Sequence, residues 1–328
     1  MLNIVLLLLL FLWACRDQRT ESPLLVDDIE RAPLLACTER DGLHMPGSVT
    51  ELSRAGDTAI TALFADARTI LQFDESLRVL RRLELAPDGP HGIADPISVI
   101  ATNDSLLIAD AEGEQLVVFD WSGVKRRSIP TDFAPLHIVE TQSGIAIAPA
   151  IVGRFPGTLL FTLRHGQLRR EEVGVVDFPD LTTKALGNRV RLLPAGNSLI
   201  LLHQFFTPRA VLVGEGGQRA LRVPLARALR SAIGYVPPLP LNDEALQPAL
   251  VVANDAAPSE RGELLLLVRT GRAAGGRFEK AIMRTDSLLN FLAAYRLPIS
   301  PGLMTYVPRT RTALLVDEED RWFTCRLP

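Results

Sequence analysis

The chain has 328 residues, of which 47% belong to the hydrophobic set, and its formal net charge is -3 at pH 7. This length and apolar content are ample for a large hydrophobic core. The near-neutral charge excludes the strong basic field on which nucleic-acid-binding proteins rely, so we expect no nucleic-acid partner.

The chain begins with an apolar run, Leu2–Ala14, that contains a single polar residue. The run is shorter than the about 20 residues that a membrane span needs, and its length is typical of a signal-peptide core. Cys15 follows directly, and this junction resembles the lipobox of bacterial lipoproteins, in which the cysteine is lipidated. We predict a signal peptide over residues 1–14 and lipidation of Cys15. Because no cation precedes the run and Trp13 is bulky, ordinary secretion, an uncleaved anchor and a buried N-terminal strand stay open.

The polar segment Arg16–Pro23 comes next and ends in proline. Such a composition is typical of a flexible linker. We expect residues 15–32 to tether a folded domain to a bacterial membrane on its exported side, in the periplasm or on the outer surface of the cell envelope. The membrane, reached through the lipid anchor, is therefore one expected partner.

The clearest structural unit of the chain is Asp95–Pro130. It contains four apolar runs of strand length, separated by turn residues such as Asn103-Asp104 and Glu112-Gly113. A single sheet of four short strands cannot bury both of its faces, so it needs copies of itself as neighbours.

Five further segments repeat this rhythm: Ala62–Leu85, Gly144–Val173, Arg191–Pro224, Ala249–Pro298 and Met304–Leu327. In the first of them, Leu63–Asp66 matches Leu107–Asp110, so the aspartates that end both segments are expected to be equivalent. Phe73-Asp74 likewise matches Phe119-Asp120. Repeats of about 45 residues have the size of one propeller blade.

The last unit, Met304–Leu327, contains only three strands. A ring of blades must be closed, and Pro33–Thr38 can supply the fourth strand. This pairing brings Cys37 next to Cys325, and cysteines of an exported protein tend to pair in its oxidising compartment. We predict an all-β, six-bladed β-propeller over residues 33–328, closed by an N-terminal strand and a disulfide; two separate buried thiols are the alternative.

One stretch, residues 223–242, does not fit the repeat. Leu225–Ile233 places its apolar residues on one helical face, and Pro237, Pro238 and Pro240 end that pattern. We expect an insertion between the fourth and fifth blades, which is either a surface excursion or a lid or partner-contact loop.

Several short motifs are shared with a known repeat: Asp95-Pro96, Leu107–Asp110, and Val117–Asp120 followed by Gly123. With them the chain resembles the NHL-type propeller repeat, and more closely the six-bladed propeller lipoproteins of some environmental bacteria. Asp88–Gly92 looks like the Gly-Pro-Gly segment that those proteins carry before a blade. The resemblance implies the fold and no particular activity, because propellers host many unrelated functions.

The sequence predicts no catalytic, cofactor-binding or metal-binding residues. The five histidines lack the spacing of metal ligands, and Asp317–Asp320 lacks that of a calcium loop. His137 and His203 fall in or near strands, where they can face the central channel. Asp66 and Asp110 are either turn formers or ligands around that channel.

Three arginine doublets recur in the outermost strands of three successive blades: Arg81-Arg82, Arg126-Arg127 and Arg169-Arg170. Charges on an exposed edge strand discourage edge-to-edge pairing, which is one interpretation. The other is a basic stripe that meets anionic lipid headgroups or polysaccharide.

We expect a monomeric binding or scaffold module, rather than an enzyme, that takes an unidentified protein, peptide or glycan ligand and needs no cofactor. The alternative is a metal-assisted lactonase or lyase, as some NHL-related propellers are. Three or more Asp, Glu, Asn or His side chains converging on the channel favour the enzyme. Mainly apolar or small side chains there favour the binding module.

Overall fold

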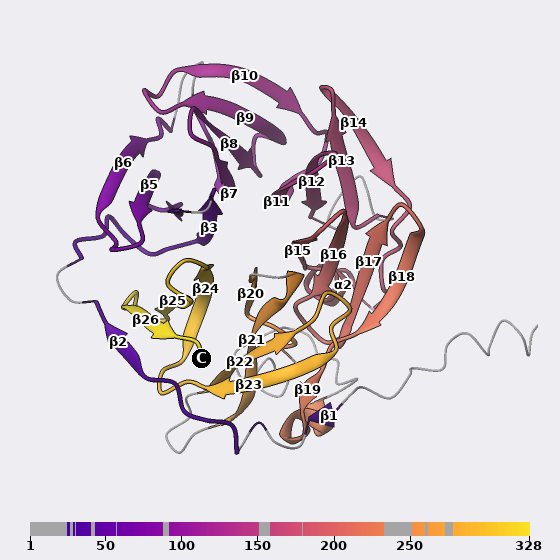
Figure 1. Ribbon diagram of the computed structural model, residues 1–328. Helices are drawn as coiled ribbons and strands as arrows, with labels where there is room; N and C mark the ends of the chain where they lie inside the picture. The colour runs from indigo at the N-terminus through magenta and orange to yellow at the C-terminus, as the bar shows by residue number, and fades with distance from the viewer. Residues whose placement is uncertain are drawn as a thin grey trace, which may run out of the picture.

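The computed structural model describes residues 25–26, 29, 31–40, 43–56, 58–87, 92–150, 158–178, 180–232, 251–259, 262–272 and 278–328. In these residues, six four-stranded antiparallel sheets follow one another around a ring (Figure 1). The predicted all-β, six-bladed propeller is confirmed.

Each of the first four blades consists of four consecutive strands. They are β3 (Glu51–Ala55), β4 (Ala59–Phe64), β5 (Thr69–Asp74) and β6 (Val79–Glu84); β7 (Pro96–Ala101), β8 (Ser105–Asp110), β9 (Gln115–Asp120) and β10 (Lys125–Pro130); β11 (Pro135–Thr141), β12 (Gly144–Pro149), β13 (Leu160–Arg164) and β14 (Gln167–Glu171); β15 (Val190–Ala195), β16 (Ser198–His203), β17 (Arg209–Gly214) and β18 (Gly217–Arg222). Blade five contains β20 (Asp255–Pro258), β21 (Leu264–Arg272), β22 (Phe278–Thr285) and β23 (Phe291–Arg296), and blade six β24 (Pro301–Val307), β25 (Thr312–Asp317) and β26 (Trp322–Arg326).

The first strand of each blade lies next to the centre of the ring, and the last strand lies at the rim (Figure 1). Second strands read as nearly continuous apolar runs because both of their faces are covered by neighbouring blades. Leu106 and Ile108 of β8, for example, are fully buried. Rim strands such as β6 are mostly exposed, and β6 carries the charged residues Arg81, Arg82 and Glu84.

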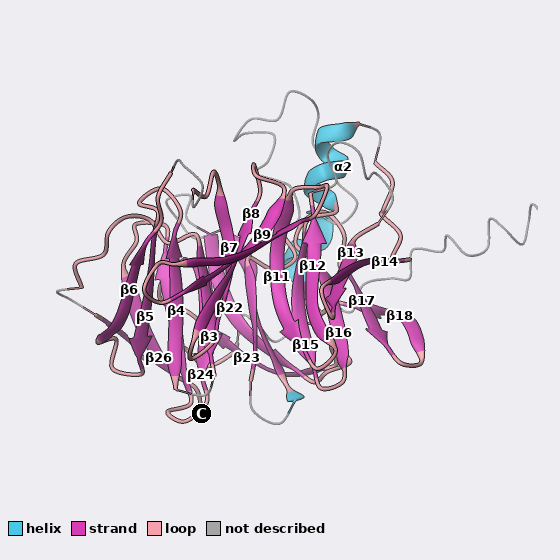
Figure 2. Cartoon of the chain, turned by 90° about the horizontal axis from the view of Figure 1, so that it is seen from above, coloured by secondary structure: helices cyan, strands magenta, loops and turns pink. Residues whose placement is uncertain are grey.

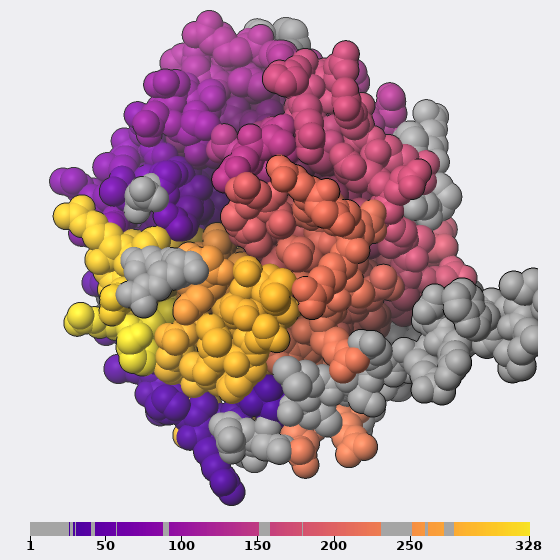
Figure 3. Space-filling model, turned by 45° about the vertical axis from the view of Figure 1, so that its right-hand side comes forward, coloured from indigo at the N-terminus to yellow at the C-terminus, as the bar shows by residue number. Residues whose placement is uncertain are grey.

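The hydrophobic core is divided into six clusters, each shared by two adjacent blades. Blades three and four, for instance, bury Leu160 of one against Leu201 of the other. This arrangement confirms the expectation that a lone sheet of this kind needs neighbours to bury its faces. In the space-filling view the blades pack side by side around the ring (Figure 3).

The ring is closed as predicted. Strand β2 (Cys37–Glu39) pairs antiparallel with β26 and is the fourth strand of blade six. A disulfide joins Cys37 to Cys325, whose Cα atoms are 4.2 Å apart. Arg40 continues the contact, because its Nε donates to the hydroxyl of Thr324 at 3.0 Å.

The expected tether is partly folded. Leu25–Val26 forms the short strand β1, which pairs in parallel with β19 (Leu225–Ala226), and Ile29 is only 1% exposed in the core between blades four and five. Val26 is partly buried against the same core, and a flexible linker does not offer such packing. The predicted signal peptide, residues 1–14, and Cys15 lie outside the described residues.

The expected equivalence of Asp66 and Asp110 is wrong. Leu63 pairs with Glu51, and Ala109 pairs with Ser98 at the corresponding position of blade two. Asp110, the next residue, is therefore equivalent to Phe64, and Asp66 falls two residues further on, inside the turn. The match of Phe73-Asp74 to Phe119-Asp120 is confirmed by the same pairing.

In the described part of the chain, two short helical segments interrupt the strands. The expected insertion begins with β19 and a 3-10 helix, η1 (Arg227–Ala232), and residues 233–250 lie outside the described part. The sequence did not predict α2 (Leu181–Gly187), which projects from one face (Figure 2). Its first turn is capped by Asp180, whose carboxylate accepts from Thr183 N at 2.8 Å. None of the described helices is long and apolar enough to cross a bilayer.

Candidate functional site at the centre of the ring

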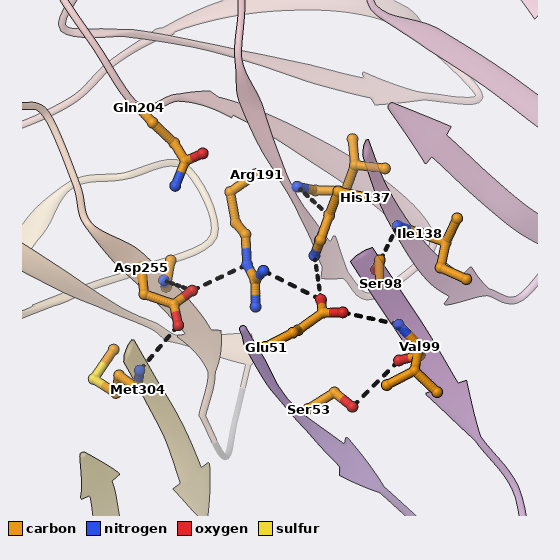
Figure 4. A network of polar contacts seen from close by, with 12 residues as sticks. Glu51, Ser53, Ser98, Val99, His137, Ile138, Arg191, Gln204, Asp255 and Met304 are labelled. Carbon is orange, nitrogen blue, oxygen red and sulfur yellow. Dashed lines mark hydrogen bonds and ion pairs between the residues drawn. The ribbon is translucent and has the colours of Figure 1, made fainter. Parts of the chain in front are cut away.

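Six residues occupy the same register position on the six inner strands: Glu51, Ser98, His137, Arg191, Asp255 and Leu303. Each pairs with the corresponding residue of its second strand. The first five are polar, and we call them the polar ring. All five side chains lie around the central axis (Figure 4).

The polar ring satisfies backbone groups that no strand can reach. The inner edge of each first strand has no neighbouring strand in its own blade, so its N–H groups need other acceptors. Four of them are met by the preceding blade: Val99 N donates to Glu51 Oε2 at 2.8 Å, Ile138 N to Ser98 Oγ at 3.1 Å, Leu192 N to His137 Nδ1 at 3.2 Å and Met304 N to Asp255 Oδ2 at 2.9 Å. These bonds join blade one to two, two to three, three to four and five to six at the axis.

Arg191 links the two carboxylates across the ring. Its Nη1 lies 3.3 Å from Glu51 Oε1, and its Nε forms an ion pair with Asp255 Oδ1 at 3.0 Å. His137 Nε2 lies 3.2 Å from the same oxygen of Glu51. Because Nδ1 of His137 accepts from a backbone N–H, Nε2 carries the proton and donates it to Glu51.

Burial and the charge of Arg191 determine the protonation states. Burial lowers the pKa of His137 to about 4, and the nearby positive charge adds to this shift, so the imidazole is neutral at pH 7. Although burial raises the pKa of Glu51, its hydrogen bond with His137 and the charge of Arg191 together hold that pKa below its usual value. Burial raises the pKa of Asp255 in spite of its ion pair with Arg191.

A cavity of about 210 Å³ extends from the polar ring toward the C-terminal ends of the inner strands. Glu51, His137 and Arg191 line it at the ring. Beyond them, its lining includes the apolar Ile100, Val139, Leu193 and Ala257 and the charged Arg54 and Glu140. Arg191 Nη2 has no bonding partner in the described part of the chain (Figure 4). A mostly apolar cavity thus ends at one unsatisfied pair of N–H donors.

Of the histidines named from the sequence, one lies at the site. His137 belongs to the polar ring, whereas His203 is buried within blade four and its Nδ1 lies 2.9 Å from Gly187 O. Asp110 is a turn former, because its carboxylate accepts from Asp95 N at 2.8 Å and Gly113 N at 3.2 Å. Asp66 is exposed.

Sequence reasoning missed Glu51, Ser98, Arg191 and Asp255. The signal was present but weak: in five units a polar residue precedes an apolar one near the start of the first strand. The side chains that converge here include two carboxylates, Glu51 and Asp255, and the imidazole of His137, a combination that favours an enzyme. However, Arg191 stands between the carboxylates, and no group of three or more His, Cys, Asp or Glu among the described residues is placed to hold a metal ion.

The arginine doublets lie on the rim strands as predicted, and all six side chains are exposed. Arg81 lies over the ring of Trp121 at 5.3 Å and donates to Asn103 O of the next blade. Arg82 pairs with Glu84 at 2.8 Å and Arg126 with Asp120 at 2.5 Å.

No family model and no curated protein matches the chain. Solved structures are similar in fold. A member of the DUF4221 family from Bacteroides vulgatus has a TM-score of 0.58 and 9% identity, covering 90% of this chain and 96% of its own. A luciferin-regenerating enzyme has a TM-score of 0.56 and 10% identity (89% and 95%), and a virginiamycin B lyase from Staphylococcus aureus 0.52 and 12% (90% and 100%). At these identities the likeness establishes the propeller fold alone.

Proposed function

We propose that this protein is an exported, membrane-anchored propeller that acts as a binding module. One observation carries the proposal: the cavity at the ring centre has mostly apolar walls and ends at the free Nη2 of Arg191. Both ring nitrogens of His137 and both oxygens of Glu51 are already engaged within the protein. At the ring the site therefore has room and a donor for a ligand, whereas neither His137 nor Glu51 is free to act as an acid or base.

The chemistry of the cavity defines the ligand class. Its volume of about 210 Å³ is below the about 300 Å³ at which drug-sized pockets begin, so it takes a small molecule or one end of a larger ligand. The ligand carries an oxygen acceptor for Arg191 and a short apolar body for Leu193 and Ala257.

Two probes of that shape, cyclopentanone and valerate, test the cavity by saturation-transfer NMR. We expect signals with the wild-type chain and none with Ala257→Leu, which fills the space. Ala220→Leu, on the exposed strand β18, is the matched control and should bind like the wild type. Equal signals from both variants would reject the cavity as the binding site.

Export and anchoring rest on the apolar run before Cys15 and on the Cys37–Cys325 disulfide, which is typical of oxidising compartments. Cys15→Ser should move the protein from the membrane fraction to the soluble fraction. Unchanged fractionation would contradict lipidation at this residue.

A second candidate, catalysis in the channel, is favoured by the convergence of Glu51, His137 and Asp255 around Arg191. Virginiamycin B, which a protein of similar fold acts on, is the first substrate to test by mass spectrometry. Conversion by the wild type that disappears in His137→Gln would support a lyase. Because Arg191 fills the place between the carboxylates, such a reaction would use these side chains differently from a metal-assisted enzyme.

A further inference from the structure

We propose that the rim of blades one to four binds a linear polyanion, such as an acidic polysaccharide, along a curved band of arginines. This inference names a partner for the proposed binding module, but it uses a surface separate from the cavity.

Four arginines occupy one register position on four successive rim strands. Arg81, Arg127, Arg169 and Arg219 pair with Gln72, Val118, Thr162 and Leu212 of the adjacent third strands. Those residues in turn pair with equivalent positions on the second strands. The four side chains therefore lie at one height around the ring, and we call them the arginine band. Arg219 was not part of the stripe expected from the sequence.

Charge is concentrated on the same four strands. The strands β6, β10, β14 and β18 carry nine cationic and two acidic residues, a net +7, although the whole chain carries -3. The rim strands of blades five and six, β23 and β2, carry one cation and one acid between them. The positive charge thus follows the rim of four blades and stops at the fifth.

Part of this charge is not neutralised by the protein itself. Arg127, Arg169, Arg170 and Arg219 are exposed and make no hydrogen bond or ion pair within the described residues. A guanidinium offers paired donors that match carboxylate, sulfate or phosphate oxygens. Unpaired guanidinium groups at a repeated position are suited to an anionic partner with repeated charges.

The curvature of the band favours a polymer over a membrane. The four rim strands follow the outside of the ring through four of its six blades (Figure 1). A flat bilayer touches a round rim at one or two blades, whereas a flexible chain can follow the curve and contact all four.

The rival interpretation is that these charges only protect exposed strand edges from pairing with other copies. It predicts that neutralised variants self-associate, and it predicts no affinity for polyanions. Binding and oligomeric state must therefore be measured together.

The experiment uses the full-length protein, in neutral detergent for the polymer probes polygalacturonate, heparin and neutral dextran. In the membrane arm the detergent is removed, and vesicles with and without anionic phosphatidylglycerol are compared, so that binding through the lipid anchor is subtracted. Arg127→Gln/Arg169→Gln/Arg219→Gln removes three charges from the band. Arg309→Gln/Arg311→Gln/Arg326→Gln removes three exposed charges from blade six and is the matched control.

At low salt we expect the band variant to lose at least about tenfold in affinity for the two polyanions and the control less than about threefold, with a shallower salt dependence in the band variant. Equal losses in both variants, equal binding of dextran, or phosphatidylglycerol-dependent binding of vesicles without any binding of the polyanions would each overturn the proposal. Self-association of the band variant without polyanion binding by the wild type would establish edge protection instead. Ala257→Leu should bind the polyanions normally, so failure of the cavity proposal and failure of this one are distinguishable.

Discussion

At the residue scale, Arg191 is the group on which the centre of the ring depends. Glu51 is 4% exposed and Arg191 16%, so the pair is largely desolvated. Removing one partner of a buried pair leaves an uncompensated charge, and Arg191→Met should lower the free energy of unfolding by about 3–5 kcal/mol.

Glu51→Gln in the same chain should recover part of this loss, because the amide oxygen still accepts from Val99 N and carries no charge. Urea unfolding of the two single variants and the double variant measures the coupling. A loss below about 1 kcal/mol in Arg191→Met would show that the network does not stabilise the ring.

Two buried histidines make stability depend on pH. Burial lowers the pKa values of His137 and His203 to about 4, below the value near 6.5 expected in the unfolded chain. The unfolded chain therefore binds more protons between these pH values, and stability falls as pH drops from about 6.5 toward 4, by up to roughly 3 kcal/mol for each histidine. The raised pKa of Asp255 acts in the opposite direction.

Urea unfolding between pH 4.5 and pH 7.5 measures this slope. His203→Gln should reduce it without touching the polar ring, since His203 lies within blade four. An unchanged slope in this variant would show that His203 is not a source of the pH dependence.

At the scale of elements, one turn design recurs at the outer hairpins. Asp74, Asp120 and Asp286 each accept hydrogen bonds from the backbone N–H groups two and four residues later, at 2.8–3.0 Å. The residue three positions after each aspartate has a positive φ: 62° in Leu77, 86° in Gly123 and 61° in Leu289. The carboxylate satisfies the N–H groups that such a tight turn leaves without strand partners.

Replacing this carboxylate should destabilise the hairpin. Asp286→Ala is expected to cost about 1–2 kcal/mol in the free energy of unfolding, because two N–H groups lose their acceptor. The exposed Asp66, which lies in a turn and is not equivalent to Asp110, is the control, and Asp66→Ala should stay within about 0.5 kcal/mol of the wild type. Equal effects at both sites in thermal or urea unfolding would contradict the assigned role of Asp286.

The elements could be predicted from the sequence to different degrees. The strands of Asp95–Pro130 were readable because turn residues separate apolar runs of even length. The register of Asp66 could not be predicted, because similarity between two short segments does not show whether an aspartate ends a strand or lies in a turn. Helix α2 has seven residues, too few to show helical periodicity, and its buried residues include only Thr183 and Gly187.

At the scale of the whole molecule, the closure of the ring could be predicted from the sequence, whereas the polar ring at its centre could not. The missing strand and two cysteines gave independent cues that Cys37 meets Cys325. The polar ring has no such cue, because Glu51 and Asp255 lie about 200 residues apart in the sequence and converge only once the ring and its register are known. A polar residue at the start of a short strand is common, and only its repetition at one position makes it significant.

The ring is closed by one disulfide and by the pairing of β2 with β26. Cys37–Cys325 closes a loop with a sequence separation of 288, for which the chain-entropy model gives about 6 kcal/mol as an upper value. Strand β2 pairs with β26 at only three positions, so without the disulfide it should separate before the rest of the ring unfolds.

Cys37→Ser/Cys325→Ser should therefore lower the midpoint of unfolding and speed amide exchange in Trp322–Arg326 while β8 in blade two stays protected. The Arg40→Ala variant, which removes only the hydrogen bond to Thr324, is the control and should change exchange slightly. Uniform loss of protection in all six blades would show instead that the ring opens as one unit and that the disulfide stabilises the whole fold.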